Sequence, residues 1–210
     1  MEKSKTDYTS LMVEDRIYST DNEFDIPVLD CTKQAKTGLL LPVSAYGSDS
    51  RQRTGISTYH FYVDDYRFAS LWKDPLKIVR SGVKEVVEPN LSLFDSTPIA
   101  YGLQQIYKKR WISRFWQTHG INVYADLNVS KKFYKYNILG IPKGYNAFAT
   151  RGYSDRPVSL LCEYEIAQDI SGLEHPNMIV YGGGETIKKI CNEKQIIYIE
   201  QYIRRLDVKK

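Results

Sequence analysis

Two adjacent aspartates in the stretch "YHFYVDDYRF" (59–68) are the first residues of this sequence that could carry out chemistry. Paired carboxylates after an apolar lead-in are typical of metal-dependent nucleotidyl transferases. Such a site also needs a third carboxylate on a strand well upstream, and fewer than sixty residues precede this stretch. Alternation along a strand would place Asp64 on the face of His60 and Tyr62, and Asp65 on the opposite face. We therefore interpret Asp64 as the free candidate and Asp65 as the N-cap of a following helix.

Further acidic and amide side chains are spaced along the chain so that a fold could gather them into one site. The candidate site consists of Asp64, Asp95, Asp126, Asn128 and Glu200. Carboxylate oxygens are hard ligands that suit Mg²⁺ or Mn²⁺, and Asp64 and Asp126 are the first-choice ligands if a metal binds. Mg²⁺ often takes only one or two protein carboxylates, so this set permits a metal without requiring one.

The segment from Lys131 to Arg156 combines cationic and aromatic side chains. It holds six basic residues against one acid, whereas the whole chain has a net charge of only +4, so any basic surface must be local. Lys and Arg neutralise phosphates while aromatic faces stack on bases, which favours single-stranded nucleic acid as a ligand. The nucleic-acid-binding candidates are Lys131, Lys132, Lys135, Lys143 and Arg151. A solvated, tyrosine-rich surface loop is the alternative interpretation.

The stretch "VYGGGET" (180–186) predicts a strand, a glycine turn and the start of a helix. Glycines let a backbone approach a phosphate and a helix N-terminus offers free N–H groups, so Gly182, Gly183 and Gly184 are phosphate-turn candidates. The stretch lacks the GxxxxGK[ST] and GxGxxG patterns, and Glu185 at the helix start would repel a phosphate. A tight turn without a ligand is the alternative.

Short apolar runs bounded by Pro, Gly or polar residues predict the strands that must position these side chains. The runs lie at 24–30, 38–47, 59–64, 83–88, 121–127, 145–150, 178–181 and 196–200. Helices are predicted at about 65–72, 74–81, 98–118, 157–171 and 185–192. Strand and helix alternate without hairpin signals, which argues for parallel neighbours, because antiparallel neighbours need only a turn. The sequence predicts an α/β fold with a mostly parallel sheet and crossover helices, either a small irregular (β/α) barrel or an open sheet.

This fold would bring the candidate residues together, because ligands of parallel α/β folds bind outside the carboxyl ends of the strands. The polar residues at or near those ends are Asp30, Asp64, Asp65, Asn90, Ser92, Asp95, Asp126, Asn128, Thr150, Tyr181 and Glu200. In the helix at 98–118, Arg110 and Arg114 continue an apolar stripe and point inward. A crossover helix runs antiparallel to its strand, so we expect both arginines at the amino-terminal edge of the sheet, in a structural role.

Composition bounds the class of protein. A chain of 210 residues with 42% hydrophobic content can bury one core, so we expect a flexible tail at 1–22 and one domain at 23–210. Within that domain, 23–58 would supply N-terminal strands and a loop, and 59–206 the main α/β unit. Three widely spaced cysteines predict free thiols in a reducing compartment. No apolar run approaches the roughly 20 residues of a membrane span and no secretion signal is visible, so we expect a cytoplasmic protein.

A train of motifs resembles an uncharacterised family of bacteriophage and mobile-element proteins, classed as a domain of unknown function. The matching pieces are "HFYVDDYRF" (60–68), Trp72, Pro75, "SLF" (92–94), Pro98, "RWISRFWQTHG" (110–120), "GIPKG" (140–144) and "VYG" (180–182). The family's second strand usually ends in Asp-Phe-Ser, where this chain has Asn90-Leu91-Ser92. If that aspartate is catalytic in relatives, its loss here puts a shared metal-dependent reaction in doubt. The resemblance implies a phage or mobile-element origin in a bacterial host and supplies no activity.

Three functional hypotheses follow from the sequence. The first is a phage accessory protein that binds nucleic acid or nucleotides through its strand-end face and the basic segment at 131–156. The second is a metal-dependent phosphodiesterase or nuclease that uses Asp64 and Asp126. The third is an inhibitor that binds a host protein through a surface patch. The sequence does not indicate the oligomeric state.

Overall fold

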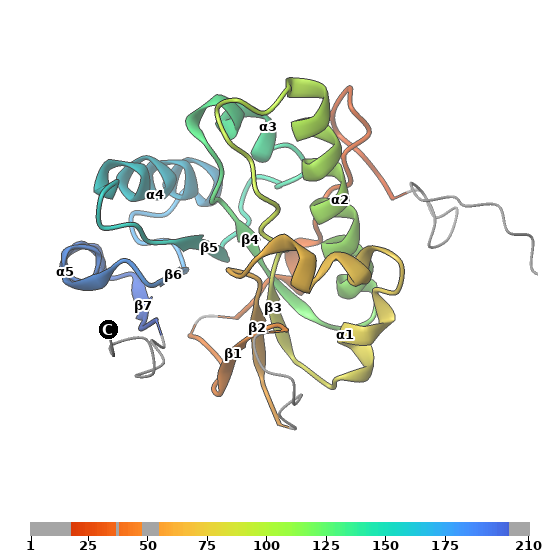
Figure 1. The fold of residues 1–210 in the computed structure, drawn as a ribbon, viewed down its shortest axis with the longest axis horizontal. Helices are drawn as coiled ribbons and strands as arrows, with labels where there is room; N and C mark the ends of the chain where they lie inside the picture. Colours follow the sequence, from red (N-terminus) through yellow and green to blue (C-terminus); the bar gives the residue numbers. More distant parts are fainter. Residues whose placement is uncertain (1–17, 37, 48–54, 202–210) are drawn as a thin grey trace, which may run out of the picture.

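The computed structural model describes residues 18–36, 38–47 and 55–201 (Figure 1). Seven short strands form one sheet in which the spatial order is the same as the order along the chain. The strands are β1 (Val43–Ala45), β2 (Thr58–His60), β3 (Glu85–Val87), β4 (Asn122–Asp126), β5 (Phe148–Arg151), β6 (Met178–Tyr181) and β7 (Ile197–Ile199). Every neighbouring pair is parallel. The predicted α/β class with a parallel sheet is therefore confirmed.

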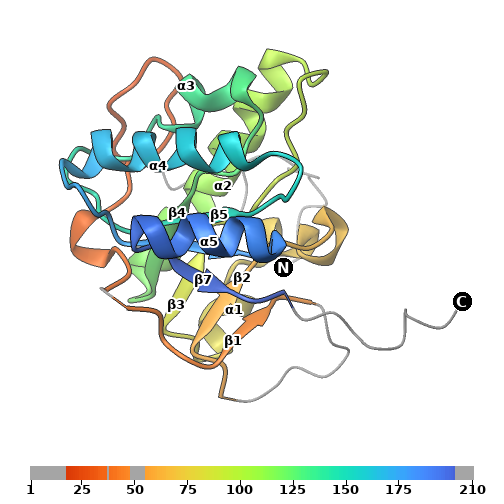
Figure 2. The same cartoon turned by 90° about the vertical axis from the view of Figure 1, so that its left-hand side faces the viewer.

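Helices connect the strands and cover the sheet. They are α1 (Leu76–Arg80), α2 (Ile99–Thr118), α3 (Tyr134–Asn137), α4 (Pro157–Ser171) and α5 (Gly184–Lys194), with 3-10 turns η1 (Cys31–Lys33), η2 (Asp65–Arg67), η3 (Ala69–Trp72) and η4 (Lys131–Phe133). Figure 2 shows α4 and α5 running side by side over the strands. The helix predicted at 157–171 has the bounds of α4, whereas the one predicted at 65–72 forms two 3-10 turns.

The sheet curls into a half-barrel, and the short distances between aromatic rings of β2 and β6 show its curvature. Strands β2 and β6 are four places apart in the sheet, which would separate them by about 19 Å if the sheet were flat. Instead, the ring centroids of His60 and Tyr181 are 4.2 Å apart, and those of Tyr62 and Tyr181 are 5.9 Å apart. Side chains at or just after the carboxyl ends of distant strands therefore meet inside the curve.

The outer face of β2 packs on an aromatic core beneath α2. Phe61 is fully buried and stacks on Trp116 with a centroid distance of 5.6 Å. The indole N–H of Trp116 donates to the carbonyl of Pro75 at 3.0 Å, which fixes the turn before α1. Because Phe61 faces outward, alternation directs His60 and Tyr62 inward, and the predicted sharing of one face by these two side chains is confirmed.

The prediction of a strand at 24–30 is wrong. Residues 24–30 join no strand of the sheet; Pro27 forms an isolated antiparallel bridge with Thr20, and the backbone N–H of Leu29 donates to the carbonyl of Gly140. Ile26 is buried in a small cluster with residues of α2, so the apolar character of this run reflects packing on a helix rather than strand pairing. The sheet consequently has seven strands where the sequence predicts eight.

Part of the predicted N-terminal tail is packed. Residues 1–17 lie outside the described residues, but Tyr18 is buried with its ring centroid 5.8 Å from that of Trp111. Cys31, Cys162 and Cys191 are free, as predicted. No helix among the described residues has the length and apolar character that crossing a membrane requires.

Candidate functional site

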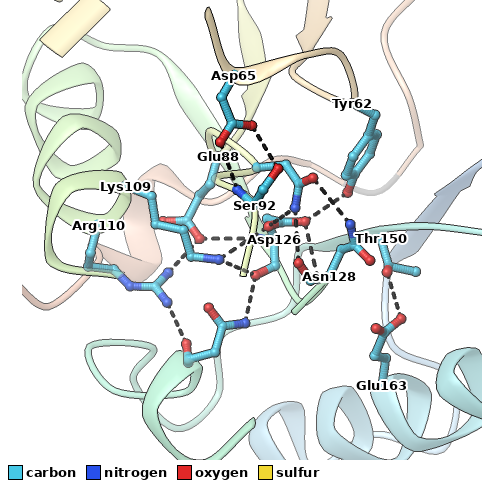
Figure 3. Close-up of polar contacts among 12 residues, drawn as sticks. Tyr62, Asp65, Glu88, Ser92, Lys109, Arg110, Asp126, Asn128, Thr150 and Glu163 are labelled. Carbon is cyan, nitrogen blue, oxygen red and sulfur yellow. Dashed lines mark hydrogen bonds and ion pairs between the residues drawn. The ribbon is translucent and has the colours of Figure 1, made fainter. Parts of the chain in front are cut away.

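A buried carboxylate at the end of β4 is the centre of a polar network (Figure 3). Asp126 is fully buried, and its oxygens accept hydrogen bonds from Tyr62 Oη at 3.1 Å and Asn90 Nδ2 at 3.1 Å. Lys109 Nζ lies 3.2 Å from Asp126 Oδ2, and the backbone N–H of Asn128 donates to Oδ1 at 3.2 Å. These donors come from four different segments, so the network joins the loops after β2, β3 and β4 to α2.

A second buried ion pair lies beside the first. Arg110 donates to Glu88 Oε2 at 2.6 Å and to the carbonyl of Asn137 at 2.7 Å. The same oxygen of Glu88 accepts from the backbone N–H of Asp126 at 3.0 Å, which connects the two pairs. Lys109 and Arg110 are thus neighbours on α2 that each neutralise one buried carboxylate.

The predicted location of Arg110 is wrong. Glu88 directly follows β3, so Arg110 contacts the carboxyl edge of the sheet rather than the amino edge. The reason is that helical side chains point back toward the helix N-terminus, and the N-terminus of α2 lies at the carboxyl edge. Arg114, one turn later, does lie on the amino side, 3.9 Å from Asp30.

Electrostatics within the network favour charge neutrality. Burial raises the pKa of the Asp126 carboxyl, and the Lys109 ammonium and the Asn90 amide oppose that change. Burial also raises the pKa of Tyr62, and the neighbouring Asp126 raises it further, so the phenol stays protonated and donates. The central cluster therefore consists of two compensated ion pairs and neutral donors.

Glu163 on α4 is a buried carboxyl that sequence reasoning missed. Thr150 Oγ1 donates to Glu163 Oε2 at 2.6 Å, and burial, with help from the charge of Asp126, raises the pKa of Glu163 to about 8. Glu163 is therefore mostly protonated at neutral pH. Its place on the apolar face of the helix, three residues after the buried Leu160, was the available signal.

The outer layer of the site is partly exposed and carries cations and aromatic rings. Tyr153 follows β5, and the guanidinium carbons of Arg151 and Arg156 lie 5.3 and 4.0 Å from its ring centroid. Asn128 Nδ2 donates to Asn90 Oδ1 at 3.2 Å and to the Tyr153 hydroxyl at 3.5 Å. This contact connects the outer layer to the buried network around Asp126.

His60 is a neutral side chain at the inner wall. Burial and the nearby Arg151 cation lower the pKa of His60 to about 3. The backbone N–H of Tyr62 donates to His60 Nδ1 at 3.3 Å, so in the neutral ring the proton resides on Nε2. His60 thus supplies a ring N–H without adding charge.

The five residues of the candidate site do not all converge. Asp126 and Asn128 belong to the network, but Asp64 is exposed and lies 3.6 Å from Arg67. Asp95 is exposed with its backbone carbonyl bound to Lys132, and Glu200 is exposed and lies 3.9 Å from Lys188. Among the described residues, no three His, Cys, Asp or Glu side chains are grouped so that they could hold a metal ion.

Asp65 has a different role from the predicted one. It begins the 3-10 turn η2 and makes no side-chain cap to it, so the N-cap prediction is wrong. Its carboxylate instead accepts from the backbone N–H and the hydroxyl of Ser92, both at 3.0 Å. Asp65 therefore ties the loop after β2 to the loop after β3.

The predicted basic segment divides between the two ends of the sheet. Lys131, Lys132 and Lys135 are exposed in η4 and α3, which follow the carboxyl end of β4. Arg151 lies at the carboxyl end of β5. Lys143 precedes β5, on the amino side, and donates to the carbonyl of Asp169 at 2.8 Å.

The three glycines after β6 permit a close approach between backbones. Gly182, Gly183 and Gly184 have φ values of 73°, 96° and 70°, a region that favours glycine. A Cβ on Gly183 would lie 2.8 Å from the carbonyl carbon of Gly152. This packing of the turn against the loop after β5 accounts for glycine at position 183, and the phosphate-turn function of the three glycines stays a prediction.

Comparisons with known proteins identify relatives but no structural counterpart. A family model described as "Domain of unknown function (DUF4417)" matches residues 18–202. The "Gene 1 protein" of Mycobacterium phage L5 is 30% identical over 149 residues, which cover 68% of this chain and 63% of that protein. The "Gene 1 protein" of Mycobacterium phage D29 is 24% identical over 147 residues, which cover 68% and 53%. The chain thus spans less than two thirds of the length of these curated relatives. No solved structure matches it.

Proposed function

The chain belongs to the DUF4417 family, a domain of unknown function with relatives in mycobacteriophages, and we propose that its half-barrel binds a nucleotide at the carboxyl end of the sheet. The family membership agrees with the phage resemblance of the motif train. It supplies no activity, so the proposal rests on the site. The observation that carries it is the pair of arginines stacked on Tyr153.

Arg151 and Arg156 supply the phosphate-binding element. Both guanidinium groups lie over the Tyr153 ring, and among the described residues neither has a carboxylate within ion-pair distance. Arginine suits this role because its planar group is weakly hydrated and binds phosphate oxygens in a bidentate manner. Stacking on one ring also holds the two cations in place before a ligand arrives.

The buried acids beneath them do not cancel this positive charge. Asp126 is paired with Lys109, and Glu88 is paired with Arg110. Glu163, with a pKa of about 8, is mostly neutral at pH 7. At the surface of this segment the exposed Asp155 offsets part of the charge of Arg151 and Arg156, and the net charge that remains is positive, which favours an anion.

The neighbouring amide and aromatic groups suit the sugar and base. Asn128 is partly exposed and uses its Nδ2 for Asn90 and Tyr153, which leaves its carbonyl oxygen as an acceptor. Tyr181 is half-buried and stacked on Tyr62, with His60 beside it. A base placed here would meet the faces of the aromatic rings, the side-chain oxygen of Asn128 as an acceptor and the Nε2–H of His60 as a donor.

Calorimetric titration with the four nucleoside 5′-monophosphates, inorganic phosphate and a nucleoside tests the proposal. We expect at least one monophosphate to bind more tightly than phosphate or the nucleoside, with an affinity that falls as salt increases. Arg156→Gln removes an exposed cation next to Tyr153 and should weaken binding at least tenfold. Lys143→Gln, which removes an exposed cation at the opposite end of the sheet, is the matched control and should change little. Absence of any nucleotide binding, or equal losses in the two variants, would refute the proposal.

A further inference from the structure

Two aromatic side chains protrude from the carboxyl rim beyond the proposed nucleotide site. Tyr66, in η2 after β2, is 72% exposed, and Phe94, in the loop after β3, is 64% exposed. Both belong to loops that also contribute to the site, because Tyr62 precedes η2 and Asn90 precedes Phe94. Large exposed rings at the rim of a ligand site indicate a contact surface.

The two loops are held together before any ligand binds. Asp65 accepts two hydrogen bonds from Ser92. Tyr66 is the residue after Asp65, and Phe94 lies two residues after Ser92, so this contact holds both rings near the same junction. The loop of Phe94 is fixed from the other side, where Lys132 Nζ donates to the carbonyls of Asp95 and Thr97. Rings carried by loops that are already held in place lose little backbone entropy when they bind, so they are suited to stacking.

A continuous series of contacts connects these rings to the arginines. Tyr153 after β5 contacts Asn128 after β4, Asn128 contacts Asn90 after β3, and the loop of Asn90 is bound through Ser92 to Asp65 after β2. Measured along the curved backbone of the rim, four successive strand ends span three inter-strand spacings, a path of about 14 Å. Stacked nucleotides advance by about 3.4 Å each along a strand, so this length accommodates about four nucleotides rather than one.

Cations accompany the rings along the same rim. The guanidinium carbon of Arg67 lies 5.5 Å from the Tyr66 ring centroid, and the exposed Lys132 is bound to the loop of Phe94 through the carbonyls of Asp95 and Thr97. A cation near each exposed ring suits a single strand, whose bases stack on rings while its phosphates attract cations. The exposed Asp64 lies 3.6 Å from Arg67 and offsets part of its charge. Stacking should therefore contribute more than charge at this part of the rim.

From these observations we infer that the ligand is a single-stranded nucleic acid segment of about four nucleotides, whose bases stack on Tyr66 and Phe94. The inference rests on the proposed nucleotide site, which would bind one unit of the strand. It differs from that proposal in requiring neighbouring bases outside the site. A duplex would not satisfy it, because stacking of neighbouring base pairs inside the double helix covers the base faces that the two rings would contact.

Fluorescence anisotropy with deoxythymidylate of one, two, four and eight nucleotides tests the inference. We expect affinity to rise at least tenfold from one nucleotide to four and then to level off, and a duplex of eight pairs to compete poorly. Tyr66→Ala and Phe94→Ala should each weaken binding of the four-nucleotide strand fivefold or more and leave mononucleotide affinity unchanged. Leu173→Ala, which removes an exposed apolar side chain at the amino side, is the matched control.

The outcomes separate the inference from the proposal on which it rests. If mononucleotides bind but longer strands bind no more tightly, the inference is wrong and the nucleotide site stands. If length increases affinity while both aromatic variants bind as the wild type does, the rings do not stack on bases and belong to a protein contact instead, which also overturns the inference. If no nucleotide or strand binds, both are wrong.

Discussion

Removal of the Lys109 ammonium should destabilise the fold strongly, because it leaves a buried charge without its partner. In Lys109→Met, the carboxylate of Asp126, fully buried, would lose the cation at 3.2 Å. Breaking a buried pair in this way costs about 3–5 kcal/mol. Three donors to Asp126 remain, from Tyr62, Asn90 and the backbone of Asn128, so we expect a loss near the lower limit, about 3 kcal/mol at pH 8.

The loss should depend on pH, and the sign follows from linkage. Burial already raises the pKa of Asp126 above its unfolded value in the wild type, and loss of the opposing ammonium raises it further. The folded variant therefore binds more protons than the folded wild type between their two folded pKa values, so the deficit is smallest at low pH and grows as pH rises through that window. Urea unfolding of wild type and Lys109→Met at pH 5 and pH 8 measures it.

Two further variants make the result interpretable. Arg80→Met removes the cation of an exposed pair with Asp74, at 3.0 Å, and should cost less than about 1 kcal/mol. Lys109→Met combined with Asp126→Asn removes both charges and should recover part of the stability lost by the single variant. A loss in Lys109→Met no larger than that of Arg80→Met, with no dependence on pH, would refute the account of the central pair.

Three other predictions concern Glu163 and Gly102. The folded pKa of Glu163, about 8, exceeds its unfolded value of about 4.3. The stability that the protonated carboxyl contributes should therefore decline between these two pH values, by at most about 1.4 kcal/mol per pH unit. Urea unfolding of Glu163→Gln across this range should lack the slope. Nucleotide affinity of the wild type should fall as pH rises from 7 to 9, because the negative charge of ionised Glu163 offsets the positive charge of Arg156. Nucleotide titration of Glu163→Gln over the same pH range should show no such decline. Gly102→Ala would place a Cβ 2.1 Å from Cε1 of the buried Phe133. It should lower the unfolding free energy by about 1–3 kcal/mol, although alanine has the higher helix propensity. Recovery of stability when Gly102→Ala is combined with Phe133→Leu would confirm the clash.

Local sequence patterns predicted most of the sheet because they report local physics. Apolar runs located all seven strands, and alternation correctly assigned His60 and Tyr62 to one face, where both rings meet Tyr181. Alternation fails at Asp64, because β2 ends at His60 and the chain turns into η2. The same pattern misidentified 24–30, since an apolar run packed on a helix has no feature that distinguishes it from a strand.

Long-range contacts of the site were beyond the reach of sequence patterns. The rule that ligands bind at carboxyl strand ends selected Asp126 and Asn128, which do belong to the network. Lys109 was missed because its contact with Asp126 depends on how α2 lies over β4 and on the direction of a long side chain. Glu163 was missed because its environment comes from three-dimensional burial, although an acid on the apolar face of α4 was a visible signal.

Photochemical cross-linking tests the location of the proposed site most directly. A mononucleotide that carries 5-iodouracil is bound to the full chain, irradiated and mapped by peptide mass spectrometry. Adducts at Tyr153 or Tyr181, lost when unlabelled nucleotide competes, are the predicted result. Adducts confined to the amino side of the sheet, near Lys143, or labelling that competitor does not reduce, would contradict the assignment of the ligand to the carboxyl end of the half-barrel.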